Sequence, residues 1–385
     1  MRVVVMGMMG RTPFAGVAWQ VLHYLEGFRR LGCEVSYVED TGDWPYDPVR
    51  NAVTDDSAHP VAFIGALMSW LGLMDRWAYT SPDGRRHGPL GSSLAQVYAE
   101  ADALVNLTGA TVLGDQHLGV PARLYLETDP VLAQIEVAQG DRFTIELLEA
   151  HTHHFTYAEN LGGPDCEVPL ERFDYLTTRP PVVLDWWATG ARAGPPRDAR
   201  FTTVSSWEQS GKDAEWRGET YYWSKHREFL KLVDLPRRVS HPLELALACD
   251  DDEVLGLLRS HGWRVIDGVA LSRDIQPYRE YIRGSRAEFT VAKDQYVRLR
   301  TGWFSDRSAC YLAAGRPVVT QDTGFGRALP TGEGLLAFSG LDDAAEAIEA
   351  VAADPRRHSL AAQDIAREHL AAERVVGDLL AAARL

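Results

Sequence analysis

Stretches that favour strands and helices alternate along most of the chain. Residues 2–7 form an apolar run rich in valine that ends at Gly7, which predicts a buried strand. Apolar residues recur at helical spacing over 17–31, with Gly32 as the stop signal, and 33–39 again favour a strand. A strand, a helix and a second strand in this order are typical of a parallel sheet with crossover helices. The pattern therefore predicts an α/β protein.

This alternation occurs in two series, and residues 160–200, rich in proline and glycine, lie between them. The first series predicts strands over 103–107 and 123–127 and helices over 61–73, 92–100 and 143–150. The second predicts strands over 201–207, 243–248, 263–266, 288–292 and 317–320, and helices over 221–232, 253–260, 278–284, 342–353 and 359–383. A short strand is expected at 182–186. We therefore expect two doubly wound domains, 1–180 and 201–360, with a linker at 181–200 and a terminal helix at 361–385.

Length and charge narrow the classes of protein that remain. A chain of 385 residues is long for one core, which also favours two domains. The net charge of −15 argues against nucleic acid as a partner. Four widely spaced cysteines and a start that runs straight into the first strand predict a cytoplasmic protein without a signal peptide. The apolar run at 61–74 is too short for a transmembrane segment, which needs about 20 residues.

Residues 301–324 carry the clearest chemical signal. Ser305 is a good N-cap residue, and Asp306 favours the positive end of a helix. Arg307 and Ser308 follow in the first helical turn, so backbone N–H groups, a hydroxyl and a guanidinium come together. Such a group suits a diphosphate. The alternatives are an ordinary helix–strand joint and, for Arg307, a salt bridge with Asp306 or Asp322.

The segment A-A-G-R-P-V-V-T-Q-D-T-G, followed by P-T-G-E-G-L-L-A-F and an alanine-rich helix, resembles the C-terminal domain of GT-B glycosyltransferases. The opening strand–loop–helix, E-T-D-P and H-F-T-Y-A-E-N-L-G extend the resemblance to a bacterial group related to the spore-maturation protein CgeB. The resemblance implies two Rossmann-like domains facing a cleft, with the nucleotide-sugar donor on the second domain and the terminal helix crossing back to the first. One feature departs from it: where retaining relatives carry an E-x7-E pair, this chain has Gly302 and Cys310. Retention by that route is therefore in doubt.

The donor site implied by this resemblance draws on residues at the ends of predicted strands, where ligands bind in open parallel sheets. Lys293 follows the strand at 288–292, and Lys212 resembles the basic residue that such enzymes carry after the first strand of the second domain. Each lysine has the alternative of being an ordinary surface residue. The remaining candidates for substrate binding are Gly16, Ser206, Thr323 and Gly324.

A general base is not obvious in the sequence. The first loop, 8–20, contains no His, Asp or Glu, so the candidates are Asp129, His153 and Glu159. Asp129 precedes a proline and is equally well explained as a helix cap. Three histidines occur at 151–154, but no acidic or cysteine partner completes a ligand set. We therefore expect neither a metal site nor a cofactor.

The sequence thus predicts a metal-independent glycosyltransferase that moves a sugar from a nucleoside diphosphate sugar to a small-molecule, glycan or natural-product acceptor. The insertion at 40–90 carries Trp70, Trp77 and Tyr79, which either shape the acceptor pocket or pack in the core. Packing in the core is the better explanation for Trp70. The alternatives are a GT-B sugar-nucleotide epimerase and a non-catalytic nucleotide-sugar-binding protein.

Overall fold

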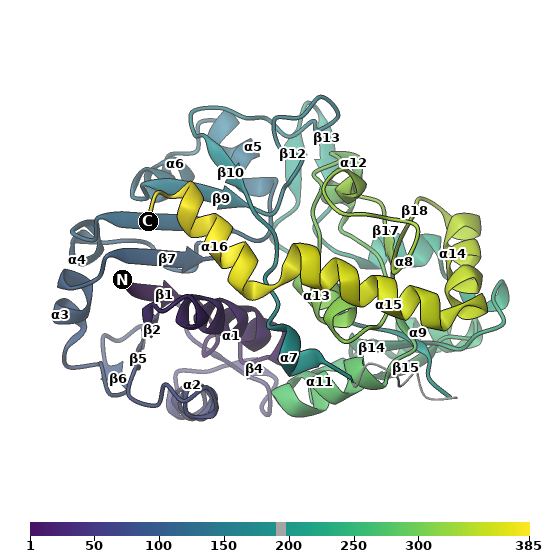
Figure 1. The fold of residues 1–385 in the computed structure, drawn as a ribbon, viewed down its shortest axis with the longest axis horizontal. Helices are drawn as coiled ribbons and strands as arrows, with labels where there is room; N and C mark the ends of the chain where they lie inside the picture. The colour runs from purple at the N-terminus through teal and green to yellow at the C-terminus, as the bar shows by residue number, and fades with distance from the viewer. Residues whose placement is uncertain (190–197) are drawn as a thin grey trace.

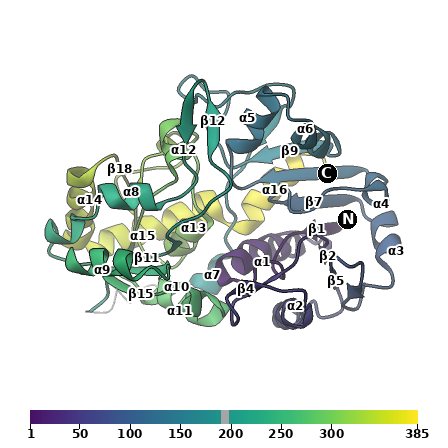
Figure 2. The same cartoon turned by 180° about the vertical axis from the view of Figure 1, so that it is seen from behind.

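The computed structural model of the protein describes residues 1–189 and 198–385. Within them, two largely parallel sheets lie side by side, each flanked by helices (Figures 1 and 2). The predicted α/β class with two doubly wound domains is confirmed. Part of the expected linker, 190–197, lies outside the described residues.

The first sheet has the strand order β10-β9-β8-β7-β1-β2-β5-β6, and β6 is antiparallel to β5. Its strands are β1 (Arg2–Met6), β2 (Glu34–Glu39), β5 (Trp77–Thr80), β6 (Arg86–His87), β7 (Ala103–Leu107), β8 (Ala122–Glu127), β9 (His153–Thr156) and β10 (Tyr175–Thr177). The hairpin and helices of this domain are β3 (Tyr46–Asp47), β4 (Ala52–Val53), α1 (Ala15–Arg30), α2 (Ala58–Trp70), α3 (Leu94–Ala99), α4 (Asp115–Leu118), α5 (Leu132–Ala138) and α6 (Arg142–Glu149). Because β1 pairs with β2 on one side and β7 on the other, the loop after β1 opens at a topological switch point.

The second sheet is parallel throughout, in the order β15-β14-β11-β16-β17-β18. Its strands are β11 (Phe201–Ser206), β14 (Leu243–Ala248), β15 (Arg264–Asp267), β16 (Ala287–Thr290), β17 (Val318–Gln321) and β18 (Leu335–Phe338). The accompanying hairpin and helices are β12 (Ala214–Trp216), β13 (Glu219–Tyr221), α8 (His226–Lys231), α9 (Asp252–Ser260), α10 (Gly268–Ser272), α11 (Ile275–Gly284), α12 (Asp294–Arg298), α13 (Asp306–Ala313), α14 (Leu341–Ala353) and α15 (Pro355–Ile365). Here the switch point lies between β11 and β16, so β11 in this sheet corresponds to β1 in the first.

Three predicted elements differ in the structure. Residue Val182 makes only a single bridge, and the apolar run after it forms the short helix α7 (Leu184–Trp187). The predicted helix at 221–232 begins only at His226, because Tyr221 belongs to the β12–β13 hairpin. The predicted helix at 359–383 is broken at Ala371, whose φ of −53° and ψ of 129° end a π-helical turn before α16 (Ala372–Ala382).

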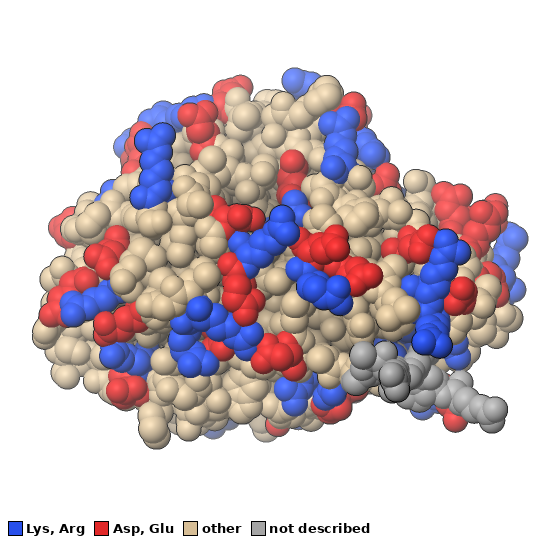
Figure 3. Space-filling view, viewed as in Figure 1, with Lys and Arg blue, Asp and Glu red and all other residues tan. Residues whose placement is uncertain are grey.

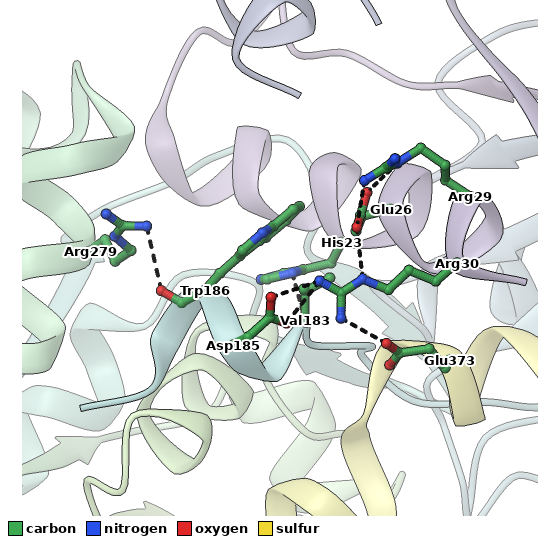
Figure 4. A network of polar contacts seen from close by, with 9 residues as sticks. All are labelled: His23, Glu26, Arg29, Arg30, Val183, Asp185, Trp186, Arg279 and Glu373. Carbon is green, nitrogen blue, oxygen red and sulfur yellow. Dashed lines mark hydrogen bonds and ion pairs between the residues drawn. The ribbon is translucent and has the colours of Figure 1, made fainter. Parts of the chain in front are cut away.

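The chain passes between the domains twice, and the two passages are hydrogen-bonded to each other. The N–H of Val182 donates to the carbonyl of Leu370 at 2.7 Å, and the N–H of Ala372 donates to the carbonyl of Val182 at 2.9 Å. Arg30 on α1 binds Glu26, Asp185 near the first passage and Glu373 at the start of α16 (Figure 4). One guanidinium therefore joins the first domain to both passages.

Helix α16 lies along α1 of the first domain (Figure 1). The contact is close at Gly27, where a Cβ atom would lie 2.8 Å from the Cγ2 atom of Val376. Val376 and Leu379 belong to the same buried cluster as Trp19 and Phe28. The last helix of the chain thus covers the first.

Asn160, in the first domain, holds a loop of the second domain. Its side-chain amide donates to the carbonyls of Arg300 at 3.1 Å and Gly324 at 3.0 Å, and its N–H donates to the carbonyl of Thr301 at 2.9 Å. A cluster of buried apolar residues adjoins this contact and draws on both domains, with Val131, Ile135, Val168, Ala214, Tyr221, Trp223, Tyr296 and Leu299. The domains are therefore joined beside the loop that precedes α13.

Candidate functional site

A cavity of about 450 Å³ lies where the switch points of the two sheets face each other. The loop after β1 and the start of α1 form one wall, and the ends of β11 and β16 with the start of α13 form the other. Its volume is within the range of sites for small molecules. The lining residues used below are Met8, Thr12, Phe14, Gly16, Val17, Trp19, Gln20, His23, Asp129, Ser206, Lys225, Tyr278, Lys293, Trp303, Ser305, Asp306, Arg307 and Cys310.

A buried carboxylate shapes the first-domain wall. Glu39, at the end of β2, accepts hydrogen bonds from the N–H groups of Gly10 and Arg11 at 2.7 and 2.6 Å. The hydroxyl of Tyr37 donates to the same carboxylate at 2.6 Å. Burial raises the pKa of Glu39 to about 7, although these hydrogen bonds favour the ionised form. The carboxylate of Glu39 therefore holds the loop after β1, which lines the cavity, and sequence analysis did not identify this residue.

Two lysines on the opposite wall face the cavity in different ways. Lys293 donates to Asp129 Oδ1 at 2.6 Å, and the hydroxyl of Tyr296 donates to the same oxygen. Burial lowers the pKa of Lys293 to about 8, while Asp129 opposes that shift. Burial also opposes ionisation of Asp129, but the Lys293 charge and the two hydrogen bonds hold its pKa below the usual value. Lys293 and Asp129 thus form an ion pair across the cavity.

Lys225 is a buried lysine at the cavity without an ionic partner among the described residues. The residue is 9% exposed, and within the described residues its side chain makes neither a hydrogen bond nor an ion pair. Its Nζ atom lies 5.8 Å from the ring centre of Trp303. Burial lowers its pKa well below the usual value, and the positive charges of Arg307 and Lys293 add to that effect, while the negative charges of Glu288 and Asp129 oppose it. A buried ammonium group in this setting is short of negative charge.

Sequence analysis did not identify Lys225 as a site residue. The predicted helix at 221–232 would place Lys225 inside a helix. In the structure α8 starts at His226, so Lys225 stands at the N-cap position, at the edge of the cavity. Lys212, the predicted candidate, is exposed, with its Nζ atom 4.8 Å from the ring centre of Trp223, and does not line the cavity.

Arg307 lines the cavity but is already engaged. Its Nε atom donates to Glu288, and its two terminal nitrogens donate to the carbonyl of Val204 and the hydroxyl of Thr290, both at 2.8 Å. The alternative for Arg307, a salt bridge with Asp306 or Asp322, is wrong in its partner, because Arg307 pairs with the fully buried Glu288. Asp322 instead lies 3.3 Å from Arg300.

Ser305 and Asp306 begin α13 at the cavity as the sequence predicts, although the Ser305 side chain makes no capping hydrogen bond. Asp306 Oδ2 accepts from the side-chain amide of Gln20 at 2.9 Å, and Oδ1 accepts from the hydroxyl of Tyr157 at 3.3 Å. Burial raises the pKa of Asp306 to about 7. This carboxylate of the second domain is thus held by the first.

Some of the other site residues predicted from the sequence line the cavity, and the rest do not. Gly16, Ser206 and Asp129 line it. The candidates outside the lining are His153, Glu159, Lys212, Ser308, Thr323 and Gly324. His153 contacts the hydroxyl of Thr152, Glu159 pairs with Arg179, and Ser308 Oγ is buried without a hydrogen-bond partner. Thr323 donates to the carbonyl of Trp303, and the carbonyl of Gly324 accepts from Asn160.

The aromatic residues of the insertion reverse their expected roles. Trp77 and Tyr79 are buried in the core of the first domain, at 7% and 1% exposed. Trp70 is 41% exposed, and its ring centre lies 5.0 Å from that of Trp186.

The described residues contain no group of three or more His, Cys, Asp or Glu side chains placed to hold a metal ion. His151 and His154 instead contact the carbonyls of Leu147 and Leu148. No helix formed by residues 1–189 or 198–385 is long and apolar enough to cross a bilayer.

Comparisons with known proteins identify the fold. The sequence matches no protein-family model and no curated protein sequence. Among solved structures, AviGT4, a glycosyltransferase involved in avilamycin A biosynthesis, has a TM-score of 0.55 at 13% identity, covering 100% of this chain and 97% of its own. HepE of Anabaena, in complex with UDP-glucose, has a TM-score of 0.56 at 13% identity over 99% and 100%. An α-glucosyltransferase bound to UDP and mismatched DNA has a TM-score of 0.59 at 10% identity over 100% of both chains.

These likenesses span the whole chain and establish the GT-B fold that the sequence predicted. The identities are too low to carry substrates or residue roles from those proteins to this one.

Proposed function

We propose that the protein is a glycosyltransferase that takes a sugar from a nucleoside diphosphate sugar. The observation that carries this proposal is Lys225, a buried cation without an anionic partner in a cavity at both switch points. A diphosphate would supply the missing negative charge, and a departing diphosphate needs the positive charge that Lys225 offers beside the Lys293–Asp129 ion pair. The three neighbours described above are glycosyltransferases, and two were solved with UDP or UDP-glucose, which favours the same donor class.

We further propose that the transfer needs no bound metal, since the two lysines and the start of α13 provide positive potential for the leaving group. Under this proposal, EDTA leaves UDP binding and turnover unchanged. Loss of turnover with EDTA, followed by rescue with manganese, would rule it out.

The acceptor is proposed to be a small molecule or a glycan rather than a nucleic acid. The net charge is −15, which disfavours approach to a phosphate backbone. On the face drawn in Figure 3, basic side chains lie beside acidic ones and form no continuous basic stripe. The wall formed by Met8, Phe14, Val17 and Trp19 is largely apolar, which suits an acceptor with an apolar body. We also propose that the protein is related to the CgeB-like group and that it acts in the cytoplasm.

The test compares Lys225→Met with Arg142→Met. Lys225→Met is expected to weaken UDP binding about 10- to 100-fold, the scale of one charged hydrogen-bonding partner. The same change should raise the melting temperature of the unliganded protein, because it replaces a buried amine, whose ionisation burial opposes, with an apolar side chain of similar length. Arg142→Met, at an exposed position on α6, should alter neither quantity.

Calorimetry with UDP and thermal unfolding provide the two measurements. Equal UDP affinity of Lys225→Met and the wild type would contradict the proposed site. If the wild type binds no nucleoside diphosphate at all, the proposed function fails as a whole. Product analysis after incubation with UDP-glucose then separates sugar transfer from epimerisation and from binding without reaction.

A further inference from the structure

Two carboxylates face the cavity in contrasting surroundings. Asp129 is paired with Lys293 and Tyr296, and its pKa is held below the usual value. Asp306 has no cationic partner among its hydrogen-bonding groups, and burial raises its pKa to about 7. A pair of acidic groups whose surroundings separate their pKa values often divides the work of a reaction. Asp129 is therefore suited to remain ionised, and Asp306 to exchange a proton near neutral pH.

The position of Asp306 also sets it apart from the cations. It is the first residue of α13 in the second domain, but its two oxygens are held by Gln20 and Tyr157 of the first domain. Tyr157 in turn shares a 2.9 Å hydrogen bond with Tyr24, which is fully buried. A chain of hydroxyl groups thus fixes the carboxylate against the wall that carries Phe14 and Trp19. This is the wall proposed above for the acceptor.

Titratable groups surround Asp306 on every element that packs close to it. They are His23 and Tyr24 on α1, Asp129 after β8, Tyr157 after β9, Tyr278 on α11, Glu288 on β16, and Arg307 and Cys310 on α13 itself. Burial lowers the pKa of His23 to about 3, so this imidazole is neutral. Arg307 and Glu288 compensate each other. The tyrosines and Cys310 have raised pKa values, so among these groups Asp306 is the one expected to change charge between pH 5 and 9. Burial also lowers the pKa of two lysines of the same cavity, Lys293 to about 8 and Lys225 well below its usual value, so these cations lose charge toward the upper end of that range.

We propose that Asp306 is the general base of the transfer and receives the proton of the acceptor hydroxyl. The acceptor oxygen forms a bond with the anomeric carbon of the sugar as the bond from that carbon to the diphosphate oxygen breaks. The electron pair of the broken bond leaves with the diphosphate, and the hydroxyl proton passes to the carboxylate of Asp306. Tyr157 and Gln20 act as positioning residues that aim the carboxylate. The inference rests on the proposed function.

The pH dependence has a definite sign. A base must be ionised to accept a proton, so the rate rises with pH through about 7. Above about pH 8 the loss of the Lys293 charge weakens the hold on the diphosphate, so the rate should then fall. The hydroxyl of Tyr157 donates to the carboxylate and thereby favours its ionised form. Tyr157→Phe should therefore move the midpoint of the pH profile upward.

The experiment uses the full chain, UDP-glucose and water as the acceptor. UDP release is followed from pH 5.5 to 9, and UDP affinity is measured by calorimetry for each variant. Asp306→Asn is expected to bind UDP within about twofold of the wild type and to release UDP about 10²- to 10⁴-fold more slowly, without the rise near pH 7. Asp364→Asn, on the exposed side of α15, is the control and should behave as wild type.

Each outcome bears on the inference. An Asp306→Asn variant that releases UDP as fast as the wild type overturns it, and so does a wild type that binds UDP-glucose without any hydrolysis. An unchanged midpoint for a folded Tyr157→Phe would also contradict it. Failure of the wild type to bind UDP instead contradicts the proposed function, so the two failures are distinguishable.

Discussion

At the scale of single residues, the hydrogen bonds that a cation already makes decide whether it is available to a ligand. Lys225 and Arg307 line the same cavity, but the guanidinium of Arg307 is hydrogen-bonded to Glu288, Val204 and Thr290. Sequence analysis selected Arg307 because it lies in the first turn of a helix. The pairing with Glu288 was not predictable from that local pattern, because Glu288 is 19 positions away in the chain. Donor binding by Arg307 stays a prediction.

The geometry predicts a large effect of Arg307 on stability. Arg307→Ala would leave the carboxylate of Glu288, which is 0% exposed, without its cation and should reduce the free energy of unfolding by about 3–5 kcal/mol. Adding Glu288→Gln to this variant removes the uncompensated charge and should restore part of the loss. Urea unfolding of both variants measures the difference. Arg307→Ala with wild-type stability would show that the pair does not hold the charge as described.

At the scale of elements, the hydrophobic pattern predicted most long helices and buried strands, including β1, α1, β2, β14, α9 and α14, to within a few residues. It failed where short elements depend on distant partners. The β12–β13 hairpin contributes to a cluster with α5 and α12, and no local pattern announces that contact. The late start of α8 follows from this hairpin, and the place of Lys225 at the cavity follows from α8.

The loop before α13 depends on Asn160. Asn160→Ala would leave the carbonyls of Arg300 and Gly324 without this donor and should lower the free energy of unfolding by about 1–3 kcal/mol. Because the same loop carries Trp303 and Ser305 into the cavity, UDP affinity should fall as well. Gln96→Ala, at an exposed position on α3, is the control for both measurements. Unchanged unfolding and binding for Asn160→Ala would mean that the loop is held by other contacts.

At the scale of the whole molecule, the packing of α16 on α1 allows a matched comparison of two glycines within helices. Alanine favours a helix by about 1 kcal/mol over glycine, so Gly377→Ala, whose new Cβ meets only Leu31 at 3.9 Å, should stabilise the protein. Gly27→Ala should lose that gain and destabilise, because its Cβ meets Val376 at 2.8 Å and the carbonyl of Ala372 at 3.3 Å. The melting temperatures of the two variants should therefore move in opposite directions.

Truncating Val376 to alanine in the Gly27→Ala background checks the cause of this difference. The double variant should recover stability relative to Gly27→Ala if the two side chains clash. Additive losses would instead indicate that α16 shifts away from α1 and that the contact is less rigid than the structure shows.

The arrangement of α16 also has a consequence for the order of events during synthesis. Domains commonly fold as they leave the ribosome, the N-terminal one first. Here the helix that covers Gly27 of α1 follows every strand of both sheets in the chain. We expect nascent chains to keep part of the surface of α1 open to water until residues 372–382 have emerged. The N-terminal domain is then made first and completed last. We expect a chaperone to bind the growing chain at the uncovered surface of α1.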